Sequence, residues 1–110
     1  MKLLVLVLSR IELQDRILEQ LERSGIRGAT ILTSRGMATA LEKYMGGSFL
    51  GGLRAVMEPD RADNRTIFTV IRDDQVQTAL DAIDRIIDLD APNTGVVFTL
   101  PVDFIKGTTL

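Results

Sequence analysis

The sequence contains neither cysteine nor histidine, and these two absences exclude much of catalytic chemistry. Without them the chain has no thiol nucleophile, no disulfide, no imidazole general base and none of the usual ligands of zinc or copper. Tryptophan is also absent, and aromatic residues make up only 5% of the 110 residues. The core is therefore expected to consist mainly of leucine, isoleucine, valine, alanine and methionine.

The chain also has no excess of positively charged residues. The 13 Lys and Arg residues and 15 Asp and Glu residues give a net charge of −2. This is the wrong sign for a protein that binds duplex nucleic acid, so nucleic acid is not an expected partner. The apolar run at residues 3–8 is far shorter than the roughly 18 residues that cross a bilayer. We expect no membrane insertion and, because this run lacks an export signal, a cytoplasmic location.

The first third of the chain predicts a strand, a helix and a second strand. Residues 3–8 are apolar on both faces, which is typical of a central strand covered on both sides. Residues 9–12 (Ser-Arg-Ile-Glu) fit a capping box at the start of a helix. That helix is expected to end near Ser24, where Gly25 can adopt a left-handed cap and Ile26 can close the end with an apolar contact.

The rest of the chain repeats this order after a long insert. Residues 29–33 form the second predicted strand, and residues 66–71 form the third because they are rich in β-branched and aromatic side chains. The aspartate pair 73–74 can cap the next helix, whose apolar residues recur at spacings of three and four through residues 76–87. Residues 96–100 form the last strand.

This order of elements is typical of an α+β, ferredoxin-like βαββαβ sandwich, with a four-stranded antiparallel sheet and two helices on one face. We expect residues 1–110 to form a single domain of this kind. The first and fourth strands carry large apolar side chains at consecutive positions, so the face without helices also stays apolar. Self-association through that open face is the predicted consequence. A lid formed by the insert is the alternative.

The insert spans residues 36–64, although about four to six residues normally suffice for such a connection. Helix-forming residues at 37–45 predict a short helix. The glycine pairs at 46–47 and 51–52 permit movement, and methionine and phenylalanine adapt to a partner surface. The residues expected to contact a partner protein are Met37, Tyr44, Met45, Phe49, Leu50 and Met57. The alternative is that the predicted helix packs on its own domain or on a neighbouring subunit.

The carboxylates do not form a catalytic or metal-binding pattern. Asp81, Asp84 and Asp88 lie on the solvent side of the predicted helix, and the pair 73–74 complements the dipole at its start. No catalytic residue and no metal ligand is predicted.

Donors for an anionic ligand are present at a few other positions. Arg35 and Gly36 end the second predicted strand, and Thr30 and Lys106 add a hydroxyl and a cation. Such groups can bind a phosphate or a carboxylate.

Residues 25–30 (Gly-Ile-Arg-Gly-Ala-Thr), running on to Arg35 and Gly36, resemble the end of the first helix and the second strand of P-II-type signal transduction proteins. The order of elements, the aspartate pair and the large loop are similar to that family too. So is the ending at residues 100–107, Leu-Pro-Val-Asp-Phe-Ile-Lys-Gly. The resemblance covers the layout of residues 1–107.

P-II-like proteins are homotrimers whose sheets face inward and which bind small ligands, often adenine nucleotides, in clefts between subunits. The residues that the resemblance places at the ligand are Thr30, Arg35, Gly36, Val70 and, near phosphate, Lys106. It also implies that residues 36–64 dock on a target enzyme or membrane transporter. The implied function is non-enzymatic signal transduction in nitrogen regulation, with no required cofactor.

One segment departs from the family. P-II proteins carry a glycine-rich loop with an acidic residue and a lysine just before the last strand, whereas residues 90–95 here read Asp-Ala-Pro-Asn-Thr-Gly. Gly95 alone corresponds and is the one ligand residue that the resemblance implies in this segment, which offers no run of backbone amides and no cation to a phosphate chain. ATP binding in the family's manner is therefore not predicted, and a smaller nucleotide or no nucleotide stays open.

Two other classes of function share the predicted fold. A metal-binding trimer resembling the divalent-cation tolerance proteins would be limited to carboxylate sites for hard ions. A small ferredoxin-like enzyme would need a carboxylate whose pKa is raised in an apolar pocket, since histidine is absent.

Overall fold

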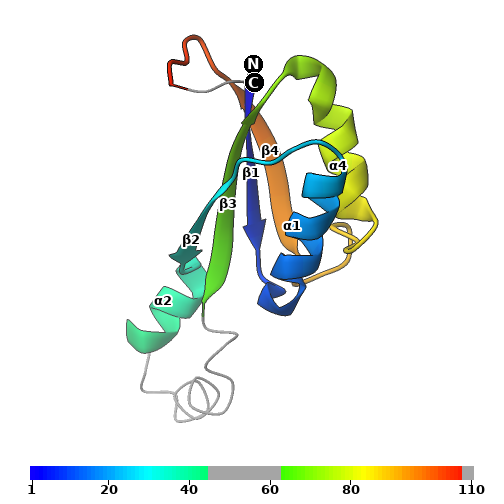
Figure 1. The fold of residues 1–110 in the computed structure, drawn as a ribbon. Helices are drawn as coiled ribbons and strands as arrows, with labels where there is room; N and C mark the ends of the chain where they lie inside the picture. The colour runs from blue at the N-terminus through cyan, green and yellow to red at the C-terminus, as the bar shows by residue number, and fades with distance from the viewer. Residues whose placement is uncertain (45–62, 108–110) are drawn as a thin grey trace.

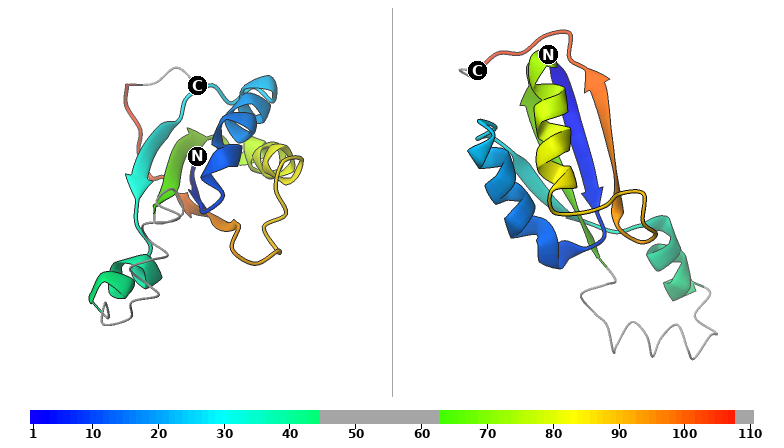
Figure 2. Two further views of the ribbon diagram at one scale, coloured as in Figure 1. Left: turned by 90° about the horizontal axis from the view of Figure 1, so that it is seen from below. Right: turned by 90° about the vertical axis from the view of Figure 1, so that its right-hand side faces the viewer.

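The structure is a computed structural model that describes residues 1–44 and 63–107. Its strands form an antiparallel sheet in the order β2-β3-β1-β4 (Figure 1). The strands are β1 (Lys2–Leu8), β2 (Thr30–Ser34), β3 (Asn64–Ile71) and β4 (Gly95–Pro101), and the α-helices are α1 (Gln14–Arg23), α2 (Met37–Tyr44) and α4 (Val76–Asp84). Helices α1 and α4 lie on the same face of the sheet (Figures 1 and 2). This arrangement confirms the predicted ferredoxin-like α+β fold.

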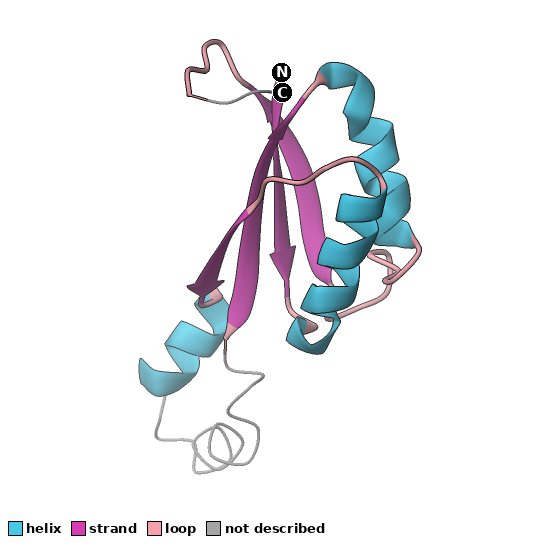
Figure 3. Ribbon diagram, in the orientation of Figure 1, coloured by secondary structure: helices cyan, strands magenta, loops and turns pink. Residues whose placement is uncertain are grey.

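The core lies between the sheet and these two helices (Figure 3). Strand β1 is central, with β3 on one side and β4 on the other. Its alternate residues Leu4, Leu6 and Leu8 are fully buried, as the twofold periodicity of a strand requires when one face meets a helical layer. The buried residues that the helices contribute to this core are Ile17, Leu21, Ala79, Ala82 and Ile83.

The end of α1 follows the prediction. Gly25 has a φ of 91°, and its N–H donates to the Glu22 carbonyl oxygen at 3.0 Å. The Ile26 N–H donates to the Leu21 carbonyl oxygen at 2.9 Å, and Ile26 is buried. Together these bonds form a Schellman motif, in which a glycine in the left-handed conformation lets the chain satisfy the last carbonyls of the helix.

The predicted start of this helix is wrong. No side chain caps it, and the chain enters α1 through a 3-10 turn at Ile11–Leu13. The Ser9 N–H donates to the carbonyl oxygen of Thr94, and the Glu12 carboxylate pairs with the Arg10 guanidinium at 2.5 Å. The Glu12 carboxylate and the Ser9 N–H, which a capping box requires, are thus engaged by Arg10 and by Thr94.

The predicted aspartate cap at the second helix is also wrong. A 3-10 turn (Asp73–Gln75) precedes α4, and the residue before it is Arg72. The Gln75 side-chain oxygen accepts a hydrogen bond from the Arg72 N–H at 2.9 Å. The Asp73 carboxylate instead pairs with the Met1 amino group, and Asp74 pairs with Arg72. Both aspartates lie inside the turn, where their charge still favours a helix start.

The sheet face away from α1 and α4 is apolar, as predicted. The alternate residues Val96, Phe98 and Leu100 of β4 are each about half exposed, and Leu32 on β2 is 47% exposed. The registers place all four on the face opposite the buried leucines of β1. The insert segment that could form a lid, residues 45–62, lies outside the described residues.

Helix α2 confirms the helix expected within residues 37–45. It continues beyond the end of β2 and points away from the sheet (Figure 1). Met37 is 78% exposed and Leu41 is 45% exposed. Met37 and Leu41 therefore do not pack on the described part of their own domain.

Gly95 is required where β4 begins, which gives a prediction for stability. A Cβ atom at Gly95 would lie 2.5 Å from the Val7 carbonyl oxygen, whereas a Cβ at Gly28 would meet nothing within 4 Å. We expect Gly95→Ala to lower the free energy of unfolding by about 2 kcal/mol, because backbone atoms must move to admit the methyl group. Gly28→Ala should change it by less than about 0.5 kcal/mol. Urea denaturation of both variants measures this, and equal stability of the two contradicts the close approach.

Candidate functional site

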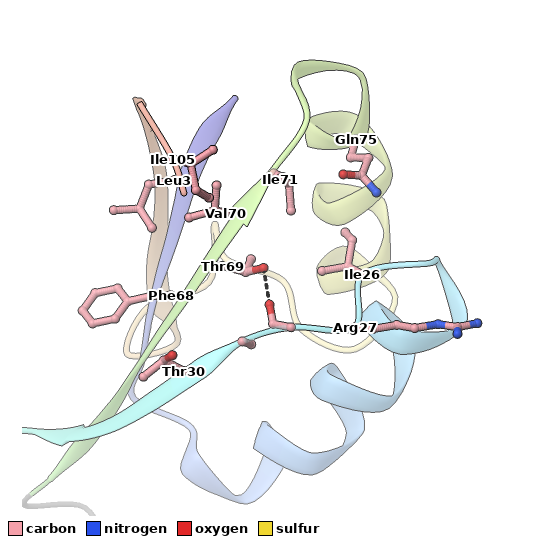
Figure 4. Close-up of a pocket in the computed structure, with 12 residues that line it drawn as sticks. Leu3, Ile26, Arg27, Thr30, Phe68, Thr69, Val70, Ile71, Gln75 and Ile105 are labelled. Atoms are coloured by element: carbon pink, nitrogen blue, oxygen red, sulfur yellow. Dashed lines mark hydrogen bonds between the residues drawn. The ribbon is translucent and has the colours of Figure 1, made fainter. Parts of the chain in front are cut away.

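A cavity of about 430 Å³ opens where β2 separates from β3 (Figure 4). The β2–β3 pairing begins with Thr30 opposite Phe68, so residues 26–29 lie outside the ladder. The lining residues are Leu3, Ile26, Arg27, Gly28, Ala29, Thr30, Phe68, Thr69, Val70, Ile71, Gln75 and Ile105. The cavity therefore lies between two chain segments, residues 26–30 and residues 68–71.

The lining is mainly apolar and includes no carboxylate. Leu3, Phe68 and Val70 approach the cavity from the open face of the sheet, and Ile105 comes from the segment after β4. The polar side chains of the lining are those of Arg27, Thr30, Thr69 and Gln75. A pocket with an apolar lining and a few oriented polar groups is typical of sites for small organic ligands.

Two of the predicted ligand residues, Thr30 and Val70, line this cavity together. A third, Lys106, directly follows the lining residue Ile105, and its own side chain is exposed. These three residues thus belong to one end of the sheet, where β3 ends and β4 continues into the C-terminal segment.

The other predicted ligand residues lie elsewhere in the chain. Arg35 and Gly36 follow the far end of β2, and Arg35 lies about 17 Å from Thr30 at the usual rise of a strand. Gly95 begins β4, which forms the opposite edge of the sheet from β2. Within one chain the structure does not bring these three residues to the cavity.

Arg35 and Gly36 lie instead at the base of the insert. Arg35 Nε lies 3.4 Å from an Asp63 carboxylate oxygen. The Ser34 hydroxyl bonds to the side chain of Asn64 and lies 2.7 Å from the Thr66 hydroxyl. These contacts join the two ends of the insert.

The predicted partner residues are only partly described. Met37 begins α2, and Tyr44 is its last residue. Met45, Phe49, Leu50 and Met57 lie outside the described residues.

The segment before β4 is organised by contacts of its own. The Thr94 hydroxyl donates to the Ala91 carbonyl oxygen at 2.8 Å, and the Thr94 carbonyl accepts from the Ser9 N–H. Asn93 has a φ of 60° and Gly95 abuts β1. The close approach of the β1 backbone is therefore a sufficient reason for a glycine at position 95.

Apart from Thr30 and Val70, the lining residues were not among the predicted ligand residues, and Phe68, Gln75 and Ile105 show why. Phe68 could have been found, because it lies two positions from Val70 and shares its face. Gln75 and Ile105 come from segments that only the folded chain brings to the cavity, so no local pattern marks them.

A comparison with protein-family models matches residues 1–107 to the family described as nitrogen regulatory protein P-II. The chain belongs to the P-II family. This confirms the resemblance drawn from residues 25–36 and from the ending of the chain. P-II proteins are regulatory signal proteins and are generally not enzymes. No curated protein matches this P-II chain.

Within residues 1–44 and 63–107, no three acidic residues are grouped so that they could hold a metal ion. The described helices include none that is long and apolar enough to span a bilayer. The Met1 amino group, 2.9 Å from Asp73, lowers the pKa of that carboxyl through a hydrogen bond and through its charge. A carboxylate that acts as a general base needs a raised pKa, so the lowered pKa of Asp73 does not suit that role.

The pair between Met1 and Asp73 predicts a pH dependence. The folded-state pKa of Asp73 is below its ordinary value of 3.8, so the pair stabilises the P-II fold fully above that value. The contribution is lost as pH falls through the lowered pKa. We expect Asp73→Asn to be less stable than the wild type near neutral pH, with a difference that closes as pH falls below 3.8 and through the lowered pKa.

Denaturation across this pH range measures the difference. Asp103→Asn removes the same charge from an exposed residue of the C-terminal segment and serves as the control. A difference between Asp73→Asn and the wild type that is constant with pH would contradict the pair.

Proposed function

We propose that this P-II chain is a non-enzymatic, cytoplasmic signal transduction protein of nitrogen regulation. It senses a small metabolite at clefts between identical subunits and regulates a target enzyme or membrane transporter through residues 36–64. The observation that carries this proposal is the family match, which extends over residues 1–107.

The proposed ligand is an adenine nucleotide. An apolar cavity with a threonine hydroxyl at its edge suits a planar base, which needs apolar contact on its faces and hydrogen bonds at its rim. Residues 90–95 lack the family's glycine-rich phosphate loop, so AMP or ADP is favoured over ATP. Arg35 and Lys106 are the proposed phosphate ligands.

A second subunit is part of this proposal. Arg35 lies just beyond the end of β2, about 17 Å from Thr30 in the same chain, and Gly36 lies farther along, too far to share a base and its phosphate. We propose that a neighbouring subunit brings its own loop base to the cavity. The half-exposed residues Val96, Phe98 and Leu100 provide an apolar surface that the subunits of a trimer would bury.

Binding would act on the insert through its base. The Arg35–Asp63 pair is exposed and spans 3.4 Å, and such pairs contribute little stability. A phosphate that engages Arg35 would therefore displace Asp63 at small cost. The insert would then populate a different set of orientations, which changes the surface that α2 and the following residues present to a target.

Ligand binding can be tested by calorimetry with AMP, ADP, ATP, cyclic AMP and bicarbonate. We expect heat from AMP or ADP and about tenfold weaker binding in Thr30→Val and in Arg35→Ala, since each variant loses one polar contact. Thr33→Val is the matched control, because Thr33 lies on the same strand and faces the other side of the sheet. Heat from none of the five compounds would contradict the sensing part of the proposal.

Assembly can be tested by sedimentation at micromolar concentration. We expect the wild type to sediment as a trimer and Phe98→Glu to sediment as a single chain, because a charge cannot be buried on the apolar face without a partner. Thr78→Glu adds the same charge to the exposed side of α4 and should leave the assembly intact. A wild-type protein that sediments as a single chain would contradict the proposed cleft between subunits.

A further inference from the structure

Thr69 is an unusual residue for its position on β3. It is only 3% exposed and lies on the helix-facing side of the strand between Ile67 and Ile71, both of which belong to the apolar core. A buried hydroxyl costs free energy unless it forms a hydrogen bond. Valine has nearly the same shape and would avoid this cost, so the hydroxyl itself needs an explanation.

The hydroxyl has a partner on the opposite wall of the cavity. The Thr69 hydroxyl donates to the Gly28 carbonyl oxygen at 2.6 Å (Figure 4). Gly28 belongs to residues 26–29, the strap, which connects α1 to β2 and forms one wall. Residues 68–71 form the other wall. The bond therefore joins the two walls across a gap that the β2–β3 ladder does not reach.

The strap is held differently at its ends and at its middle. At one end Ile26 is buried and bonds to Leu21, and at the other end Thr30 enters the ladder opposite Phe68. Between them Arg27, Gly28 and Ala29 are exposed. The Thr69 hydroxyl thus tethers the middle of the strap to the strand that carries Val70.

We infer that Thr69 is a positioning residue for ligand binding, which sets the separation of the strap from β3 and so the width of the cavity. This inference rests on the proposed function of the cavity. The Thr69 proton is committed to Gly28, so its effect on a ligand passes through the strap. Loss of the hydroxyl should free the middle of the strap while the cap and the ladder keep its ends in place.

The first test is the mobility of the strap in the free protein. Nitrogen-15 relaxation should give backbone order parameters of about 0.85 for residues 27–29 of the wild type and below about 0.6 in Thr69→Val. Thr69→Ser keeps the hydroxyl and should restore the wild-type values. Thr99→Val is the matched control. Leu4 on β1 pairs with Thr69 on β3 and with Thr99 on β4, so both threonines lie on the same face of the sheet. Wild-type order parameters in Thr69→Val would overturn the inference.

The second test is the affinity for ADP. We expect Thr69→Val to bind ADP about tenfold more weakly, with Thr69→Ser and Thr99→Val within about twofold of the wild type. Equal affinity in Thr69→Val and the wild type would overturn the positioning role. If the wild type binds none of the five compounds, the sensing part of the proposed function fails, while the relaxation measurement still decides whether Thr69 holds the strap.

Discussion

The structure depends on burying a central strand whose two faces are both apolar. Leu4, Leu6 and Leu8 point into the core beneath α1 and α4, while Leu3, Val5 and Val7 point to the other face. Helices α1 and α4 cover Leu4, Leu6 and Leu8. Phe68, Val96 and Phe98 lie beside the residues on the other face, and within the described residues no helix covers them. Val5 is buried by its neighbours in the sheet, but Val96, Phe98 and Leu100 of β4 stay about half exposed, and the proposed contact between subunits would cover them.

Most of the fold could be predicted because strand and helix periodicities record which side chains are buried. Residues 3–8 and 66–71 became β1 and β3, and Gly25 took the left-handed conformation expected of it. The helix starts could not be predicted in the same way. Ser9 and Glu12 have the chemistry of a capping box, but their polar groups interact with Thr94 and Arg10. The contact with Thr94 is tertiary and leaves no local pattern, whereas the Arg10–Glu12 pair is a local competitor for the carboxylate that the capping box needs.

The candidate site was predictable only in part. Thr30 and Val70 were found through the family resemblance, and the structure places both in one cavity. Gln75 and Ile105 reach that cavity from a helix start and a C-terminal segment, so their role depends on packing between distant parts of the chain. Gly95 shows the opposite case. A glycine that resembles a ligand-binding position has a sufficient reason in the close approach of β1.

The closed base of the insert has a consequence for how such proteins diversify. Ser34 and Asn64 bond to each other where the insert leaves and rejoins the sheet, so the chain ends are already side by side. Closing a flexible loop between fixed ends costs only about 0.6 kcal/mol more for each doubling of its length. Arms of other lengths and compositions can therefore be exchanged at this point while the hydrophobic interior stays the same. The proposed target-binding role of the insert can therefore change separately from the stability of the sheet.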